Sequence, residues 1–307
     1  MGHLRRRGAI QSGGGTQCAG MGQRDAKIGP NWLSNTLGEL ELQELHNRLE
    51  LCLRDGEHAW HALDDCEHPQ YGGGVNQFTP PNFICPSSRR IDPNETINTY
   101  CLENDGASKG SYVACWGSGN YYSGHTPNLE NDDAETRGMF RLEFLPEAYY
   151  FREITAPNPL HDNRVTLDMR WLFGHGHGTK VADVTDGLTN TLMLSEVLSF
   201  PSVKDGRGVW ASGAMGASVF STQLGPNSRT LDREPMCDQR VMDLPAPKGC
   251  QFERSSPDMW AAARSRHTKG VNAAMADASA RFISNDIAID VWRALSTISV
   301  GENVGEF

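Results

Sequence analysis

The stretch that most restricts how this chain can fold lies near its C-terminal end. Residues 271–276 and 279–283 alternate apolar and polar side chains around the turn Asp277-Ala278, which predicts a β-hairpin with a two-residue loop. That loop would place Met275 opposite Ala280 and Ala273 opposite Phe282. One face of the hairpin is then entirely apolar, and we expect it to be buried: Val271, Ala273, Met275, Ala280 and Phe282.

Two amphipathic helices are predicted, one on each side of the β-rich part of the chain. Residues 31–54 carry a stripe of leucines at helical spacing, with either Asn31 or a Thr36/Glu39 capping box at the start. A short second helix follows the hairpin over residues 287–295, with Asn285 or Asp286 as its cap.

The middle of the chain mixes short strand candidates with long irregular segments. Strands are predicted at 111–116, 138–142, 148–154, 179–184, 191–198 and 208–211, the fourth and fifth joined by the turn Asp186-Gly187. The 32 glycines and 16 prolines explain the many turns between them. The expected fold class is α+β, with an N-terminal helix on an antiparallel sheet.

Charge and hydropathy exclude several classes of protein. With 28 Lys and Arg against 38 Asp and Glu the net charge is −10, which argues against a general nucleic-acid binder. No apolar run approaches the ~20 residues of a membrane span. Arg5-Arg6-Arg7 precedes a Gly-rich stretch rather than an apolar one, so the chain shows no secretory signal and would, taken literally, be cytosolic.

The eight cysteines form no Cys-x-x-Cys unit, which argues against a zinc ribbon. Three pairs enclose short loops, and each is a possible disulfide in an oxidising compartment: Cys52/Cys66, Cys101/Cys115 and Cys237/Cys250. Buried thiols with one or two bridges remain the alternative.

Four segments, in order, resemble those of one bacterial family. They are GPNWLSNTLGELELQEL with Trp32, FICPSS with Cys85, VADVTDGLTNTLMLSE ending at Glu196, and the C-terminal run from Ser265. In that last run His267 and Asp277 are separated by nine residues, which resembles the prepilin-associated His-nine-residues-Asp-Gly signature. The chain thus resembles the pseudopilin-like family called domain of unknown function 1559, abundant in planctomycetes.

The resemblance implies a pilin-like head without catalytic activity. Residues 29–307 would form one domain after a flexible segment 1–28, working at the cell envelope or cell surface, as in type II secretion, through assembly or a protein partner. Family members usually begin with a prepilin leader and a long apolar helix, which this chain lacks, so no membrane span is expected in it. Ala278 replaces the glycine of the signature.

The signature residues His267 and Asp277 are expected to be structural, as are Arg281 and Trp292. A strand of about 3.3 Å per residue separates positions 271 and 276 by roughly 17 Å, too far for His267 and Asp277 to share one ion. Asp277 would set the turn, and His267 would hold the entry to the first strand.

Two sets of residues are candidate metal ligands. Asp183, Asp186, Asn190 and Glu196 offer the oxygen atoms that calcium prefers, although the same composition is ordinary in turns. The segment His175-Gly-His177 places two imidazoles on one side of an extended chain, without an evident third ligand. A calcium- or carbohydrate-binding envelope module is therefore an alternative function.

Two further patterns have weak functional interpretations. Trp116, Tyr121 and Tyr122 lie among glycines and could form a carbohydrate- or partner-binding platform, or else fill a core. Gly106-Ala-Ser108-Lys-Gly110 matches a serine-hydrolase nucleophile elbow, but a strand-like segment follows it instead of a helix.

Overall fold

The computed structural model describes residues 31–54, 67–68, 73–74, 78–88, 108–123, 126–127, 131, 133–141, 179–202, 204–210, 212–242, 244–253, 258–302 and 304–305. The flexible segment 1–28, the strand at 148–154 and the pair His175 and His177 lie outside these ranges.

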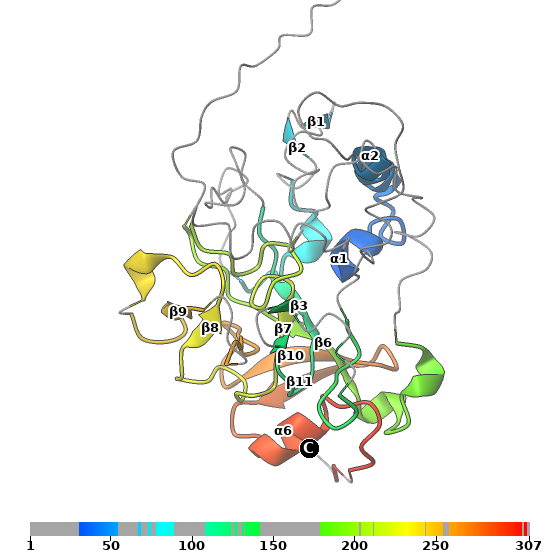
Figure 1. Cartoon of the computed structure of the whole chain (residues 1–307), viewed down its shortest axis with the longest axis vertical. Coiled ribbons are helices and arrows are strands. Elements are labelled where there is room, and N and C mark those ends of the chain that lie inside the picture. The colour runs from blue at the N-terminus through cyan, green and yellow to red at the C-terminus, as the bar shows by residue number, and fades with distance from the viewer. Residues whose placement is uncertain are drawn as a thin grey trace, which may run out of the picture.

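The centre of the fold is a five-stranded sheet with the strand order β11-β10-β6-β3-β7 (Figure 1). Its strands are β3 (Tyr112–Cys115), β6 (Leu192–Glu196), β7 (Val219–Phe220), β10 (Gly270–Met275) and β11 (Ala280–Ser284). All neighbouring pairs are antiparallel except β3 and β7, which run parallel. The fold is therefore α+β, as predicted, but the sheet is mixed rather than purely antiparallel.

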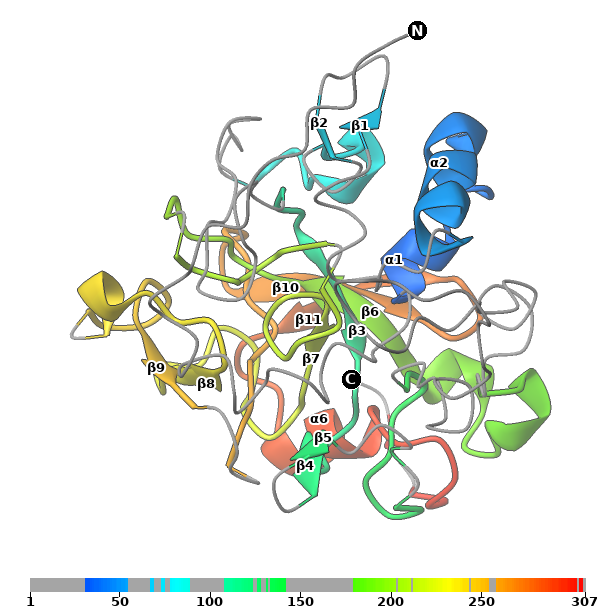
Figure 2. The same cartoon turned by 45° about the horizontal axis from the view of Figure 1, so that its top comes forward.

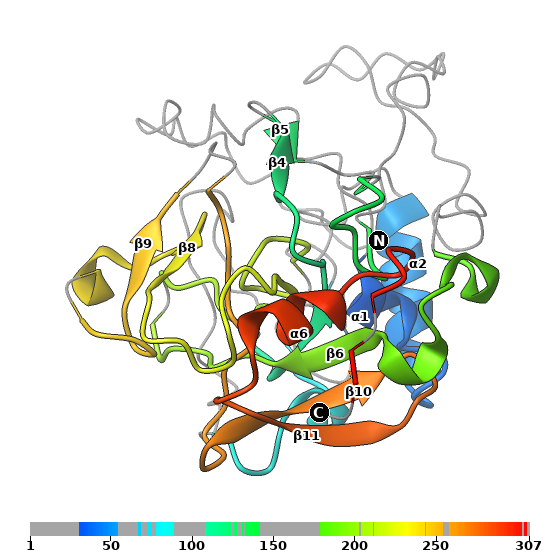
Figure 3. The same cartoon turned by 90° about the horizontal axis from the view of Figure 1, so that it is seen from below.

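One face of the sheet is covered by α6 (Ile289–Ala294), as Figure 3 shows. Trp292 of α6 is fully buried against Phe220, with ring centroids 6.2 Å apart, and its indole nitrogen donates to the Leu224 carbonyl. The apolar side chains on this face come from all five strands and from α6 with its C-cap: Val113, Cys115, Leu192, Phe220, Val271, Ala273, Met275, Ile283, Trp292 and Leu295. Burying these side chains is the main stabilising contribution here.

The opposite face packs against the N-terminal segment and loops. Trp32 packs against a buried cluster that includes Ala114, Trp116 and Met215, and its indole nitrogen donates to the Ser218 carbonyl. The alternation along β3 explains this arrangement, because Val113 and Cys115 point to one face while Ala114 points to the other.

The predicted helix at 31–54 is in fact two helices, α1 (Trp32–Asn35) and α2 (Gln43–Arg54). Asn31 caps α1 by accepting from the Ser34 amide, so Asn31 is the cap and the Thr36/Glu39 box is not formed. Glu41 interrupts the run with a φ of 61°, a conformation that no right-handed helix contains. The buried Leu37 belongs to this turn rather than to a continuous stripe.

The hairpin forms as predicted, but with a different register. Asn272, not Ala273, lies opposite Phe282, and Ala274 lies opposite Ala280. The loop has three residues, 276–278, because Met275 and Ser279 close it: the Met275 amide donates to the Ser279 carbonyl, and the Ala278 amide to the Met275 carbonyl. The shift of β11 by one residue turns Phe282 outward, 54% exposed, and buries Ile283.

The backbone conformation of Ala278 accounts for the three-residue length of this loop. Its φ is 67°, the left-handed position that follows a type I turn in three-residue hairpins and that favours glycine. The turn type therefore differs from the two-residue loop that we predicted, and an alanine occupies a position that strains it.

Two of the other predicted strands are confirmed and three are wrong. The predictions at 111–116 and 191–198 correspond to β3 and β6. Residues 181–183 instead form the 3-10 helix η4 (Val181–Asp183), which the Gly187 turn connects to η5 (Leu188–Asn190). Val209 and Arg137 make only isolated bridges, so no strand forms at 208–210 or 138–141.

The cap predicted for the last helix is also wrong. Ala288 is the N-cap of α6, and no side chain caps it. The Asp286 amide instead bonds to the Ser284 hydroxyl at the end of β11.

The remaining described elements lie around the central sheet. They are η3 (Pro81–Phe83), η6 (Gln239–Val241) and three two-stranded sheets: β1 (Glu67–His68) with β2 (Gly73–Gly74), β4 (Tyr122–Ser123) with β5 (Thr126–Pro127), and β8 (Asp232–Glu234) with β9 (Cys250–Phe252). Figure 2 shows the β8–β9 pair and the α1–α2 segment on opposite sides of the central sheet.

The cysteines agree with one of the three predicted disulfides. Cys237 and Cys250 are bonded, whereas Cys115 is a buried free thiol, so the Cys101/Cys115 bridge is wrong. The side chains of Cys52 and Cys66 lie outside the described part of the structure.

Within the described ranges, no helix combines the length and the apolar character needed to cross a bilayer.

Candidate functional site

Three side chains from distant parts of the chain meet beside the central sheet. The His267 Nε2 atom lies 3.0 Å from the Glu196 Oε1 atom and 3.7 Å from the Cys85 Sγ atom. All three potential ligand atoms lie within 4.8 Å of one another. We call this group the Cys–Glu–His cluster.

Each member comes from a different structural element. Cys85 follows the 3-10 helix η3 and begins a turn, in which the Ser88 amide donates to the Cys85 carbonyl. Glu196 ends the central strand β6, and His267 lies in the turn that leads into β10. The cluster therefore joins three segments that the sequence separates by up to 182 residues.

Hydrogen bonds fix the orientation of the Glu196 and His267 side chains. The Asn272 amide of β10 donates to Glu196 Oε2 at 2.7 Å, which leaves Oε1 directed at His267. The His267 amide donates to the Ser265 hydroxyl, and that hydroxyl in turn donates to the Gly270 carbonyl. A backbone amide of β10 thus holds the Glu196 carboxylate, and the Ser265 hydroxyl holds the backbone of His267.

The cluster is mostly shielded from water. Cys85 and Glu196 are buried, while the His267 side chain is 21% exposed. A narrow recess lies beside the cluster, lined by Cys85, Ser88, Ser111, Glu196 and neighbouring residues. The Ser88 and Ser111 hydroxyl oxygens are buried and make no hydrogen bond within the described structure.

Burial and the neighbouring carboxylate affect the acidity of the thiol. Desolvation raises the pKa of Cys85, and the hydrogen bond to Glu196 raises it further, so the cysteine is a neutral thiol at pH 7. Desolvation also raises the pKa of the adjacent Tyr112 phenol, and Cys85 and Glu196 raise it as well. A nucleophilic cysteine needs the opposite shift, toward thiolate.

The geometry is also not that of a catalytic relay. In a Cys-His-carboxylate triad, one ring nitrogen faces the thiol and the other faces the carboxylate, so that a proton passes through the ring. Here Cys85 Sγ and Glu196 Oε1 both approach Nε2 of His267. Two other potential metal ligands therefore approach the same ring nitrogen. That arrangement is typical of a set of metal ligands and not of a proton relay.

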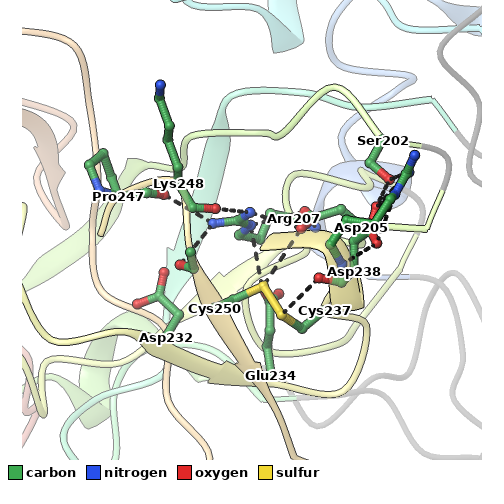
Figure 4. The surroundings of a disulfide bond; sticks show 12 residues. Ser202, Asp205, Arg207, Asp232, Glu234, Cys237, Asp238, Pro247, Lys248 and Cys250 are labelled. Carbon is green, nitrogen blue, oxygen red and sulfur yellow. Dashed lines mark hydrogen bonds and ion pairs between the residues drawn. A yellow bond between two sulfur atoms is a disulfide. The ribbon is translucent and has the colours of Figure 1, made fainter. Parts of the chain in front are cut away.

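A second group of ionisable side chains surrounds the Cys237–Cys250 disulfide (Figure 4). The Arg207 guanidinium, 1% exposed, lies 2.8 Å from Asp205 Oδ2 and 3.3 Å from Glu234 Oε1. It also donates to the carbonyls of Pro247 and Lys248. We call this group the Arg207 cluster.

The charges of the Arg207 cluster depend on one another. Burial alone would lower the pKa of Arg207, but the Asp205 and Glu234 carboxylates outweigh it and raise that pKa. Burial raises the pKa of Glu234 well above its ordinary value, and Asp205 adds to the effect. One carboxylate, that of Asp205, is thus the principal partner of the guanidinium.

The two signature residues His267 and Asp277 contact different groups. Asp277 lies in the exposed turn, where its carboxylate accepts from the Ser279 amide at 2.9 Å and from the Ser279 hydroxyl at 2.6 Å. Those bonds lower the pKa of Asp277. Arg281 lies on β11, close enough to Asp277 to lower that pKa as well, and Trp292 lies in the core under α6.

The residues of the predicted calcium site are not brought together. Asp183 accepts from the Lys180 amide, Asp186 accepts from the amides of Val300 and Gly301, and Glu196 belongs to the Cys–Glu–His cluster. The carboxylates of Asp183, Asp186 and Glu196 therefore do not converge on one point, and Asn190 closes the 3-10 helix η5. Glu196 is the last residue of β6, whereas Asp183 and Asp186 precede that strand.

The predicted aromatic platform and the predicted elbow also differ from expectation. Trp116 and Tyr121 are buried, with ring centroids 5.1 Å apart, so they fill the core and present no surface; the Tyr122 side chain lies outside the described structure. Ser108 is buried in extended chain before β3, without the strand–turn–helix geometry that a nucleophile elbow requires.

The sequence named Cys85, Glu196 and His267 for separate reasons but did not group them. The one shared signal was that each of the three residues lies in a different family-like segment. Only the long-range contacts of the tertiary structure show that these three residues meet.

Comparison with known proteins agrees with the family-like segments. The chain matches the family described as "Protein of unknown function (DUF1559)" over residues 8–290. No curated protein and no solved structure matches it. Because the match covers most of the sequence, this chain belongs to the DUF1559 family.

Proposed function

We propose that this chain is a pseudopilin-like protein of the cell envelope, which acts through self-assembly or contact with a protein partner and not through catalysis. The observation that carries the proposal is the convergence of Cys85, Glu196 and His267 inside the fold. Residues from three family-like segments hold the sheet and its loops together there, in a geometry that is unsuitable for proton relay.

Two further observations support this proposal. The Cys237–Cys250 disulfide is expected in an oxidising compartment such as the periplasm or the cell surface. The net charge of −10 disfavours nucleic acid as the partner and leaves proteins as the natural class.

The redox state of the disulfide in cells tests the location. Cells that produce the chain are quenched in acid, free thiols are alkylated, and the Cys237 and Cys250 peptides are examined by mass spectrometry. We expect both cysteines to be protected as a disulfide and the chain to fractionate with the envelope. Reduced cysteines in a cytoplasmic fraction would contradict the proposal.

Cross-linking in living cells tests the mode of action. A photo-reactive residue is placed at Phe282 or at Val181, two exposed apolar positions on different elements. We expect a discrete adduct, either with another copy of this chain or with one envelope protein, from at least one position. A matched position inside the core, Trp292, provides the control, and adducts from neither exposed position would refute the proposal.

A further inference from the structure

We propose that the Cys–Glu–His cluster binds a zinc ion through the Cys85 sulfur, the His267 Nε2 atom and one Glu196 oxygen, with a fourth ligand from water. This inference concerns the fold itself and does not depend on the proposed envelope function.

The chemistry of the three ligand atoms favours zinc. Thiolate, imidazole and carboxylate are the three side-chain ligands that Zn²⁺ uses in proteins, whereas Ca²⁺ and Mg²⁺ take oxygen atoms almost exclusively. A mixed S, N, O set with one sulfur also lies outside what a calcium loop provides. The donor types at Cys85, Glu196 and His267 therefore select a zinc-like cation.

The distances fit a tetrahedral ion. Zinc bonds of about 2.3 Å to sulfur and about 2.0–2.2 Å to nitrogen and oxygen place neighbouring ligand atoms about 3.4–3.6 Å apart. The observed separations, 3.7 Å from sulfur to nitrogen and 3.0 Å from nitrogen to oxygen, lie on either side of that range. Small side-chain rotations would be enough to close the site around an ion.

Three polar groups approach Nε2 of His267. The Glu196 oxygen lies 3.0 Å away, the Cys85 sulfur 3.7 Å and the Asn272 side-chain amide 2.7 Å. A zinc ion would use the Nε2 lone pair and take the Glu196 oxygen as a fellow ligand, and the Asn272 side chain would rotate away from Nε2 to admit it.

Charge balance also favours the ion. On binding, the Cys85 thiol loses its proton to solvent, so the site holds one thiolate, one carboxylate, a neutral imidazole and Zn²⁺. The sum of these charges is zero, as a largely buried site requires.

The surroundings have the features of a supported metal site. The Asn272 backbone amide holds Oε2 of Glu196, and the Tyr112 phenol interacts with the Cys85 sulfur. His267 is the most exposed of the three ligands, so we place the route of entry and the water ligand on its side.

The only other group of such residues in the described structure cannot act this way. Glu234, Cys237 and Cys250 also lie within 4.8 Å of one another, but the two sulfur atoms are bonded as a disulfide. That leaves the Cys–Glu–His cluster as the candidate.

The first test uses the wild-type full-length chain and needs no substitution. Bound metal is removed from the chain with a chelator under conditions that keep the disulfide intact. The alkylation rate of each cysteine is then measured by peptide mass spectrometry, with and without one equivalent of ZnCl₂. We expect zinc to slow alkylation of Cys85 about tenfold or more, and a chelator to reverse this, because a bound thiolate cannot attack. Cys115, buried away from the cluster, serves as the control within the same molecule.

The second test uses Co²⁺ as a spectroscopic substitute for zinc. We expect a sulfur-to-cobalt charge-transfer band and the visible bands of tetrahedral cobalt in the wild-type chain, both displaced by Zn²⁺. Cys85→Ser should remove the charge-transfer band, and Glu196→Gln and His267→Ala should each weaken zinc binding by more than the roughly 10–100-fold lost with an outer partner. Cys115→Ser and Asp186→Asn are matched controls and should bind as the wild type does.

The outcomes separate clearly. An unchanged alkylation rate of Cys85 in the presence of zinc would overturn the proposal, whatever happens to the variants. So would a cobalt–thiolate band that persists in Cys85→Ser, because the metal would then be held by another cysteine of the chain.

Discussion

The Arg207 cluster and the Cys–Glu–His cluster both gather ionisable side chains in the interior, but they satisfy them differently. Around Arg207 the guanidinium is paired with Asp205 and donates to backbone carbonyls, and a disulfide closes the loop beside it, although the Glu234 oxygens make no hydrogen bond in the described structure. Around His267 three groups approach one nitrogen, and no lysine or arginine side chain is paired with the Glu196 carboxylate in the described structure.

The difference shows how an interior polar site can be recognised as structural or as ligand-binding. A buried group that is matched by its neighbours is complete, and adding a ligand would disrupt it. A buried set of metal-ligand atoms that converge on one point can take up a cation as a further partner. The following changes test whether the two clusters differ in this way.

The largest effect is expected from removing the charge of Arg207. Arg207→Met leaves the Asp205 carboxylate buried without its cation, and we expect the free energy of unfolding to fall by about 3–5 kcal/mol. Urea denaturation measures this loss of unfolding free energy. Cys85→Ala in the zinc-free chain should lose only about 1 kcal/mol, because the thiol there is uncharged.

A surface arginine provides the matched control for that experiment. Arg229 is an exposed arginine, so Arg229→Met should change stability little. Equal losses for Arg207→Met and Arg229→Met would show that the pairing of Arg207 with Asp205 does not stabilise the fold as described above.

A somewhat smaller loss is expected from the disulfide. Cys237→Ala with Cys250→Ala opens a loop whose ends are 13 residues apart, and about 3 kcal/mol of stability should be lost, measured by urea denaturation. Protection of Cys85 by zinc should not change in this variant. If it were lost, the two clusters would not be independent.

A smaller, pH-dependent effect is expected at Glu234. Its pKa in the folded chain is raised, by burial first and then by Asp205, so ionisation of Glu234 weakens the fold as pH rises through that value. Glu234→Gln cannot ionise. The Glu234→Gln variant should therefore be as stable as the wild type at low pH and more stable than it toward pH 8. Thermal unfolding at a series of pH values measures this difference. A difference that shrinks with rising pH would contradict a raised pKa of Glu234.

The smallest effect concerns the hairpin that supplies Asn272 to the Cys–Glu–His cluster. Ala278→Gly should stabilise the chain by up to about 1 kcal/mol, because φ is 67° there. Ala276 has no positive φ, so Ala276→Gly should destabilise by about 0.5–1 kcal/mol. Thermal unfolding of the pair measures both, and the same sign for both would contradict the three-residue loop.

The sequence predicted the elements better than their details. Alternation identified the hairpin, β3 and β6, and loop spacing included the Cys237–Cys250 bridge among its candidates. The register of β11 was missed because the apolar pattern fits either Phe282 or Ile283 inward, and the loop conformation at Ala278 made the choice. The leucine stripe likewise could not reveal that Glu41 breaks the first helix.

By itself the sequence determined local properties: the α+β class, the family, the hairpin, and the acidic surface. These properties depend on residues that are close in the sequence or on the overall composition, and both can be read from the sequence directly. The tertiary structure alone decided which side chains meet. His267 contacts Glu196 and Cys85, 71 and 182 residues away, and not Asp277 of its own signature. Such contacts arise because packing of the whole sheet brings β6, β10 and the loop after η3 together, and no local pattern encodes those distances.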